Sequence, residues 1–267
     1  MKPTSDIHVE LKSVTRTYPA RAGHGAVHAL GPVDLTLRRG EFVGVVGPSG
    51  CGKSSLLEIV AGLAIPSTGH VTFEGVPVEG RVPDGVGVVF QEDASFPWLT
   101  VSDNVAFGLK RAGIDAAETK HRVDHAIALM GLNQFRKAYP SQLSGGMRQR
   151  VCIARTLVLR PRLILLDEPF GALDQQTRLL MGEELLRLWR DSGATVMLIT
   201  HALDEAAMLS DRVAVMSSRP GRFLDMRETG WPRERDSRIV ADPRFGQLTS
   251  KLWELIRDES RKALDLP

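Results

Sequence analysis

Short apolar runs alternate along this chain with segments of helical periodicity. The runs that we predict to be strands are residues 33–37, 42–46, 86–90, 163–166, 195–200 and 212–216. Several of them are apolar on both faces, which is typical of strands buried in a parallel sheet. The alternation therefore predicts an α/β fold with a mostly parallel sheet.

Between residues 92 and 160 no strand is predicted, and helical periodicity takes over. The predicted helices in this region are residues 102–111, 116–130 and 146–159. We interpret them as a helical insert within the α/β core. The chain is accordingly divided into a core at residues 1–91 and 161–220, a helical subdomain at 92–160 and a C-terminal extension at 221–267.

The C-terminal extension begins with a loop-like composition and ends in a predicted amphipathic helix. The apolar residues on one face of that helix are Phe245, Leu248, Leu252, Leu255 and Ile256. This face could dock a partner, or it could pack on the rest of the same domain. We favour packing, which is the commoner role of such a face.

Composition narrows the class of protein. A chain of 267 residues can bury one large α/β core, and its two cysteines give no disulfide framework and suit a reducing cytosol. The 34 basic and 32 acidic residues leave a charge of +2, so nucleic acid is not an expected partner. No apolar run is long enough to span a membrane, and the N-terminus lacks the apolar core of a signal peptide. We expect a soluble intracellular protein.

A glycine-rich turn lies between the strand at 42–46 and the next predicted helix. Its glycines allow several backbone N–H groups and the positive end of a helix dipole to point at one anion. Lys53 adds a charge for the β- and γ-phosphates of a nucleotide, and Ser54 offers a hydroxyl to Mg²⁺. The residues predicted to bind ATP here are Gly47, Pro48, Ser49, Gly50, Cys51, Gly52, Lys53, Ser54 and Ser55.

Cys51 lies in this phosphate cradle, close to Lys53 and to the start of a helix. Both neighbours favour a thiolate over a thiol. We therefore expect Cys51 to be reactive and its alkylation to block nucleotide binding.

Two adjacent carboxylates follow the strand at 163–166. Asp167 is predicted to anchor a Mg²⁺ ion that the cradle also holds. Glu168, one residue further, is suited to polarise a water for in-line attack on the γ-phosphate. Two acids at a strand end are by themselves often only solvated, and the nearby cradle is what favours the catalytic interpretation.

A second helix start suited to an anion lies at residues 143–149. Ser144 is predicted to be the N-cap of the helix, and Gly145 and Gly146 free its backbone. Pro161 is predicted to stop that helix. Alone this pattern is weak, since capped helices with glycines are common.

Taken together and in this order, the motifs resemble those of the ATP-binding subunit of an ABC transporter, over about residues 8 to 220. The resemblance identifies the P-loop at 47–54, the signature at Ser144–Gly146 and the Walker B carboxylates Asp167 and Glu168. It further assigns Tyr18 as the aromatic that stacks on adenine, Gln91 as the Q-loop residue, Asp174 as the D-loop aspartate and His201 as the switch histidine. Met147 departs from the glutamine that is most frequent at its position.

The resemblance implies a P-loop NTPase core with N-terminal antiparallel strands, ATP and Mg²⁺ as cofactors, and ATPase activity. Its catalytic residues would be Glu168, His201 and Gln91, with Ser54, Gln91 and Asp167 on the metal. Plainer interpretations stay open for several residues. Tyr18 could be packing, Gln91 a strand end and His201 a solvated surface residue. His121 and His125, four residues apart, could hold a metal but lack a third ligand, and a solvated helix face is favoured.

The resemblance also implies partners. Two copies would pair head to tail while ATP is bound, so that Ser144, Gly145 and Gly146 of one copy complete the site of the other. Integral-membrane permease subunits would dock near residues 96–100, where Phe96, Pro97 and Trp98 form an apolar loop. Whether Trp98 instead fills the core of the insert is left open. An extracytoplasmic solute-binding protein would take part indirectly, and the chain would lie on the cytoplasmic face of the bacterial inner membrane.

The loop at 96–105, the segment at 216–222 and the final helix resemble importers of nitrate, sulfonates and taurine. Two other classes of P-loop protein fit the sequence less well. A non-transport ABC ATPase usually carries tandem ATPase halves, long coiled coils or zinc clusters, and a small-molecule P-loop kinase has no use for the signature. A regulatory role of residues 221–267 is a third possibility, although they are too few for an added ligand-binding domain.

Overall fold

The computed structural model describes residues 6–20, 25–92 and 94–263, and it divides their strands between two sheets. The four-stranded antiparallel sheet has the order β2-β1-β4-β5 and consists of β1 (Ile7–Tyr18), β2 (Val27–Arg38), β4 (Thr68–Phe73) and β5 (Val76–Pro77). The six-stranded sheet has the order β10-β9-β3-β8-β7-β6 and consists of β3 (Phe42–Val46), β6 (Val86–Val89), β7 (Leu163–Asp167), β8 (Thr195–Ile199), β9 (Arg212–Met216) and β10 (Phe223–Glu228). Within it only β10 is antiparallel to its neighbour. The predicted α/β class, with a mostly parallel sheet and N-terminal antiparallel strands, is confirmed.

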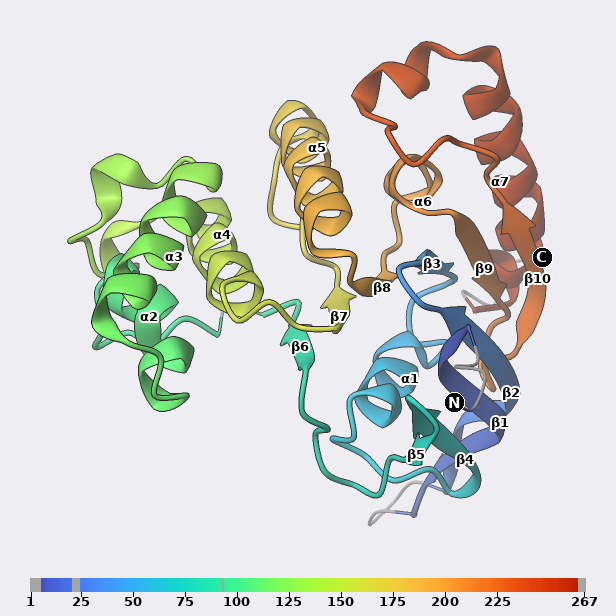
Figure 1. Cartoon of the computed structure of the whole chain (residues 1–267). Coiled ribbons are helices and arrows are strands. Elements are labelled where there is room, and N and C mark those ends of the chain that lie inside the picture. Colours follow the sequence, from blue (N-terminus) through green and yellow to red (C-terminus); the bar gives the residue numbers. More distant parts are fainter. Residues whose placement is uncertain (1–5, 21–24, 93, 264–267) are drawn as a thin grey trace.

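The parallel strands are apolar throughout because both faces of their sheet are covered. Along β3, Val43 faces a core shared with the antiparallel sheet, whereas Phe42 faces a core shared with the remaining helices. Helix α1 (Lys53–Val60) lies between the two sheets (Figure 1). Helices α5 (Gln175–Ser192) and α6 (Leu203–Leu209) contribute to the core on the opposite face.

The helical insert is defined here as α2 to α4, and Figure 1 shows it at one end of the molecule, beyond the edge strand β6. It comprises α2 (Val101–Arg111), α3 (Ala116–Leu129), the short 3₁₀ helices η1 (Asn133–Phe135) and η2 (Pro140–Gln142), and α4 (Gly145–Leu157). Side chains of Thr100, Asp115 and Ser144 accept hydrogen bonds at the starts of α2, α3 and α4, as N-caps do. Helix α4 ends two residues before its predicted end.

The segment after residue 220 is more regular than its composition suggests. Residues 223–228 form β10 on the edge of the sheet, so the prediction of a loop there was wrong. The half-exposed position of β10 explains its mixed polarity, which hid the strand. A 3₁₀ helix, η3 (Ser237–Ala241), and the long helix α7 (Pro243–Ala263) follow.

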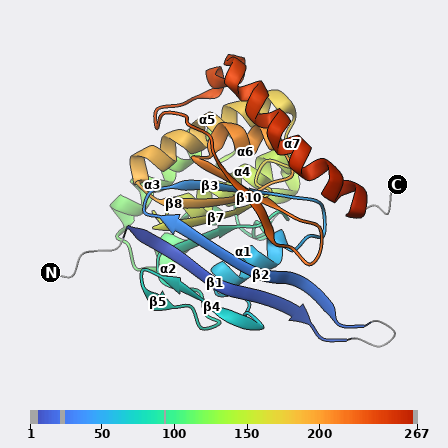
Figure 2. The same ribbon diagram turned by 90° about the vertical axis from the view of Figure 1, so that its right-hand side faces the viewer.

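Helix α7 packs on its own domain, as favoured from the sequence. Phe245, Leu252 and Ile256 are buried in the same core as α5 and α6. Near its start the ring of Phe245 stacks on Trp231 with the centroids 6.4 Å apart. Figures 1 and 2 show α7 on the side of the molecule formed by α6, β9 and β10. Within the described residues, no helix is both long enough and apolar enough to cross a membrane.

Candidate active site

The carboxyl ends of four parallel strands meet at one edge of the sheet and bring the predicted catalytic residues together. The P-loop follows β3, Gln91 comes shortly after β6, Asp167 ends β7 and His201 follows β8. The register places Asp167 opposite Ile199, and the backbone N–H of Glu168 donates to the carbonyl of Ile199 at 2.8 Å. Residues that are far apart in the sequence thereby line one site, as expected at the ends of parallel strands.

The P-loop turns back on itself through left-handed glycines. Gly50 has a φ of 73° and Gly52 a φ of 106°, conformations that L side chains rarely adopt. Gly52 is also the N-cap residue of α1, and no side chain caps this helix. The first N–H groups of α1 are therefore left to the loop and to a ligand, which is the arrangement of an anion site at a helix start.

Lys53 is buried, and its ammonium group is held by the loop itself. Its Nζ donates to the carbonyl oxygens of Gly47 and Pro48, each at 2.9 Å. Three donors on a flexible stem allow it to exchange these carbonyls for phosphate oxygens.

The thiol of Cys51 is less reactive than the sequence predicts. The thiol is 1% exposed, and burial raises its pKa, although the nearby Lys53 acts in the opposite direction. Desolvation outweighs the charge because a thiolate in an apolar setting loses its hydration. The expectation of a favoured, reactive thiolate at Cys51 was therefore wrong.

Asp167 is a buried carboxylate at the end of β7. Burial raises its pKa despite a hydrogen bond from Ser54, and the charge of Glu168 acts in the same direction as burial. Hydroxyl, carboxylate and amide oxygens from Ser54, Asp167 and Gln91 are the donors that Mg²⁺ prefers. In the described part of the chain no three His, Cys, Asp or Glu side chains gather to hold a metal by themselves. A cation here would need phosphate or water oxygens as well.

Two polar side chains contact the same carboxylate oxygen of Glu168. Its Oε2 accepts a hydrogen bond from Nε2 of Gln91 at 3.1 Å and lies 3.1 Å from Nδ1 of His201. Its backbone has a φ of 47°, which is uncommon outside glycine and costs energy that functional sites often retain. The side chain of Glu168 is 18% exposed and that of His201 58% exposed, so water can reach the carboxylate.

Glu205 was missed by the sequence reasoning. Its Oε2 accepts a hydrogen bond from the Thr200 hydroxyl at 2.7 Å, and that hydroxyl in turn accepts from the backbone N–H of Ala202 at 3.0 Å. Burial raises the pKa of Glu205 to about 7. Because Thr200 and Ala202 flank His201, Glu205 helps to shape the loop that carries it. Only burial distinguishes Glu205 from the neighbouring Asp204, and the sequence does not reveal it.

Tyr18 lies beside the first turn of α1. Its hydroxyl lies 2.9 Å from Oγ of Ser55, and the guanidinium of Arg16 stacks over its ring at 4.6 Å from the centroid. The side chain is half-buried. Its predicted contact with adenine stays a prediction.

The signature and D-loop residues are placed at two neighbouring helix starts. Ser144 accepts a hydrogen bond from the N–H of Met147 at 3.3 Å, and Asp174 accepts one from the N–H of Thr177 at 3.0 Å. Gly146 packs so closely on Leu173 that a Cβ there would collide with it. Gly146, at the start of α4, thus contacts the segment that leads into Asp174.

The loop at 96–100 is ordered by a buried amide. Asn104 is fully buried and donates to the carbonyls of Phe96, Leu99 and Thr100 at 3.0–3.1 Å. Trp98 nevertheless remains 70% exposed and stacks on Phe96, with the ring centroids 5.5 Å apart. Trp98 therefore does not fill the core of the insert.

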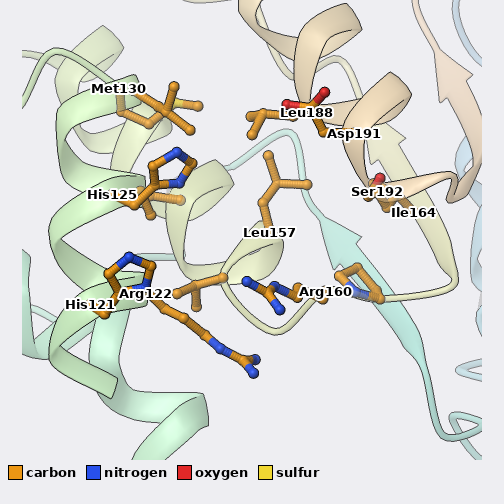
Figure 3. Close-up of a pocket in the computed structure, with 15 residues that line it drawn as sticks. His121, Arg122, His125, Met130, Leu157, Arg160, Ile164, Leu188, Asp191 and Ser192 are labelled. Carbon is orange, nitrogen blue, oxygen red and sulfur yellow. The ribbon is translucent and has the colours of Figure 1, made fainter. Parts of the chain in front are cut away.

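A cleft of about 550 Å³ opens between the insert and α5. Figure 3 shows His121, Arg122 and His125 of α3 facing Leu188 and neighbouring residues of α5 across it. Its lining is mostly apolar between these charged and polar side chains. Both histidines are exposed, as expected of a solvated helix face.

The fold and the arrangement of the site define a P-loop ATPase. The family described as ABC transporter matches residues 30–171. The nitrate import ATP-binding protein NrtD of Synechococcus elongatus is 42% identical over 249 residues, which cover 91% of this chain and 89% of that protein. An uncharacterised ABC transporter ATP-binding protein of Methanocaldococcus jannaschii is 42% identical over 264 residues, covering 99% of this chain and 97% of that protein.

Among solved structures, the chain is similar to the dimeric cassette MJ0796 of a bacterial ABC transporter. The TM-score is 0.75 at 32% identity, covering 84% of this chain and 100% of that one. A post-hydrolysis dimer of MJ0796 bound to ADP and Pi gives a TM-score of 0.74. The chain therefore belongs to the ABC transporter family, as one of its ATP-binding subunits that couple ATP hydrolysis to transport.

Proposed function

We propose that this chain powers a bacterial importer of a small anion, with nitrate, an aliphatic sulfonate or taurine as candidate solutes. The single observation that carries the ATPase role is the convergence of Gln91 and His201 on one oxygen of Glu168, at the strand ends beside the P-loop. The import of an anion is supported by similarity to proteins named for nitrate import and bicarbonate transport. Another small solute is the alternative within the same class.

In the proposed site Lys53 releases the carbonyls of Gly47 and Pro48 and binds the β- and γ-phosphates of ATP. The uncapped N–H groups at the start of α1 donate to phosphate oxygens. Tyr18 stacks on the adenine. Mg²⁺, when bound, neutralises charge on the phosphates, and Ser54, Asp167 and Gln91 are the residues that would hold it.

Glu168 acts as the general base in this proposal. Its carboxylate can accept a proton from a water molecule aligned with the γ-phosphate. Gln91 and His201 fix the direction of the carboxylate, since both lie 3.1 Å from Oε2. His201 is in addition proposed to donate to the γ-phosphate, where negative charge must be stabilised.

A second copy of the chain is proposed to complete the site. Ser144, Gly145 and Gly146 lie at the start of α4 in the insert, and Gly146 contacts Leu173 in the segment that leads into Asp174. Paired head to tail, two copies would place this anion-binding helix start opposite the P-loop of the other copy. ATP would then be required to close the dimer, and its hydrolysis would reopen it. The division into core, helical subdomain and C-terminal extension is part of the same proposal.

Permease subunits are proposed to dock on the insert. Trp98 stacks on Phe96 and is 70% exposed, which is costly for a large aromatic residue unless a partner covers it. The cleft between the insert and α5 offers a second contact. A permease segment that fills it would touch the insert and the core together, so movement between them would be passed to the membrane. The chain would then lie peripherally on the cytoplasmic face of the inner membrane, linked only indirectly to an extracytoplasmic solute-binding protein.

The test is co-purification from detergent-solubilised membranes with tagged Glu168→Gln and MgATP, followed by mass spectrometry. We expect integral-membrane permease subunits, and a sharp loss of them when Trp98→Ala is added. Phe135→Ala, which truncates another exposed aromatic residue of the insert, is the matched control and should retain the permease. Recovery of soluble nucleic-acid or ribosomal proteins alone would instead favour a non-transport ABC ATPase. The binding protein of the same system, tested with nitrate, taurine and an alkanesulfonate, decides the solute.

A further inference from the structure

The end of α7 is fastened to the turn between β9 and β10 by a buried carboxylate. Glu259 is only 8% exposed, and its Oε2 accepts hydrogen bonds from the backbone N–H and the hydroxyl of Ser218, at 2.7 and 2.8 Å. Its other oxygen accepts from Lys262 at 2.6 Å. These hydrogen bonds, that of Lys262 foremost, hold the pKa of Glu259 below its usual value. The carboxylate is therefore charged at neutral pH, and its hydrogen bonds to Ser218 are strong.

The turn at residues 217–222 is a closed unit. The N–H of Ser217 donates to the carbonyl of Arg222 at 2.9 Å, and the N–H of Arg222 donates to the Ser217 hydroxyl at 3.1 Å. If α7 moves and displaces Ser218, the whole hydrogen-bonded turn is therefore expected to move with it.

The far side of this turn rests on the P-loop. Gly221 packs so closely on Cys51 that a Cβ at this position would collide with the Cys51 carbonyl. The N–H of Gly221 donates to the carbonyl of Ala29 at 2.9 Å, and the N–H of Gly31 donates to the carbonyl of Gly221 at 3.0 Å. The turn therefore contacts both the loop and the strand β2 beside it.

Strand β2 supports the loop from the same direction. A Cβ at Gly52 would lie 2.7 Å from the carbonyl oxygen of Ala29, so the N-cap of α1 is in close contact with the segment that Gly221 binds. Cys51 and Gly52 directly precede Lys53. A continuous series of contacts thus runs from the Glu259 carboxylate through Ser218 and Gly221 to Cys51 and Gly52, the residues that directly precede the phosphate-binding Lys53.

We propose that Glu259 is a positioning residue of the nucleotide site, through which α7 holds the turn at 217–222 against the P-loop. Glu259 does not touch the nucleotide. It keeps Cys51 and Gly52 in the conformation that binds phosphate, and displacement of the end of α7 lowers the affinity for nucleotide. The C-terminal extension is in this way coupled to ATP binding without a ligand-binding domain of its own. The inference rests on the ATPase activity and is independent of the transported solute.

The experiment compares Glu259→Ala and Ser218→Ala in the full chain with Asp258→Ala. Asp258 is the matched control because it is the adjacent acid on α7, its side chain is 64% exposed and it pairs with Arg257 at the surface. The measurements are the Kd of MgADP by calorimetry, kcat and KM for MgATP, and hydrogen exchange of the amides at 47–54. MgADP is used because it is not hydrolysed.

For Glu259→Ala we expect Kd and KM to rise about fivefold or more, with kcat at saturating ATP changed by less than about twofold. Exchange of the P-loop amides should be faster, whereas Asp258→Ala should behave as the unchanged chain. A folded Glu259→Ala variant with normal Kd and normal P-loop exchange overturns the proposal. So does a loss of kcat at unchanged KM.

Two milder variants keep the test decisive if Glu259→Ala does not fold. Ser218→Ala removes one hydroxyl and leaves the backbone hydrogen bond, so a smaller rise in Kd is expected. Glu259→Gln keeps the shape of the side chain and one hydrogen-bond acceptor. Its Kd for MgADP should therefore rise by no more than that of Ser218→Ala. Normal MgADP affinity in both of these variants overturns the proposal.

Discussion

Nδ1 of His201 lies 3.1 Å from Oε2 of Glu168, the same oxygen that accepts the hydrogen bond of Gln91. Two residues from different strand ends thus converge on one carboxylate oxygen. The arrangement fixes where the second oxygen of Glu168 can point. A base that must face a single water molecule benefits from such a constraint, because orientation is a large part of catalysis.

Glu168→Gln should bind ATP normally and lose turnover. The amide keeps the size of the side chain but cannot accept a proton from water, so kcat is expected to fall by about 10²- to 10⁴-fold. Steady-state ATPase assays and MgATP binding to the same preparation measure the two effects. Glu92→Gln, an exposed acid next to Gln91, is the control and should keep its turnover. Normal hydrolysis by Glu168→Gln would mean that another group is the base.

His201→Ala should lower kcat by about 10²-fold, since one positioned donor near the γ-phosphate is removed. Adding His201→Ala to Glu168→Gln should lower kcat only slightly further, because the two side chains act as a unit. The double-mutant cycle is measured by kcat for MgATP. His70→Ala, which removes an exposed histidine on β4, serves as the control. Fully additive losses in the cycle would contradict a shared role of His201 and Glu168.

Much of the fold could be predicted because its parallel strands are buried on both faces. The runs at 42–46, 163–166 and 212–216 are apolar at nearly every position, and β3, β7 and β9 form there. Strands with a solvated side give a weaker pattern. The edge strand β10 is half-exposed and mixed in polarity, so the sequence pattern of its segment predicts a loop.

The positions of the candidate site residues followed from motif order, but their environments did not. Cys51 has a charged neighbour in the sequence, yet its reactivity depends on burial that arises only when β2 and β9 cover the P-loop. Glu205 looks like a second acid beside Asp204 until the fold buries it. The contact of Glu259 with Ser218 joins residues 41 positions apart, which no local pattern encodes.

Cys51 should react slowly with alkylating agents while the chain is folded. Burial both raises the pKa of the thiol and blocks access to it, so modification by iodoacetamide at pH 7 should be slower by more than about tenfold than in the urea-unfolded chain. Cys152→Ser allows the single remaining thiol to be followed by mass spectrometry. Rapid native modification that saturating MgADP suppresses would restore the original expectation of a reactive thiolate.

Leu252→Ala should destabilise the chain, since Leu252 is fully buried where α7 meets the core. Truncation of such a side chain removes apolar burial and leaves a cavity, for a loss of about 2–5 kcal/mol. Urea unfolding followed by circular dichroism measures the loss. Lys251→Ala, at the adjacent exposed position, should change the stability by less than about 0.5 kcal/mol. Equal effects of the two changes would mean that α7 does not pack as described.

Glu205 should make the folded chain less stable as the pH rises. Burial raises its pKa from 4.5 to about 7, so between these values the folded state binds more protons than the unfolded state. The free energy of unfolding therefore falls as the pH rises from about 4.5 to about 7, by up to about 3 kcal/mol, and stays reduced above that range. Urea unfolding at pH 5 and pH 8 measures the difference.

Glu205→Gln isolates this contribution. Glutamine can still accept the hydroxyl hydrogen bond of Thr200 but carries no charge, so this variant should lose that part of the pH dependence and exceed the unchanged chain in stability at pH 8. Asp204→Asn, on the same turn but at an exposed position, should keep the full dependence. If Glu205→Gln retained the whole decrease between pH 5 and pH 8, the decrease would belong to another group. If the stability of Glu205→Gln did not change between pH 5 and pH 8, the decrease would instead be assigned to the Glu205 carboxylate, which supports the loop of His201.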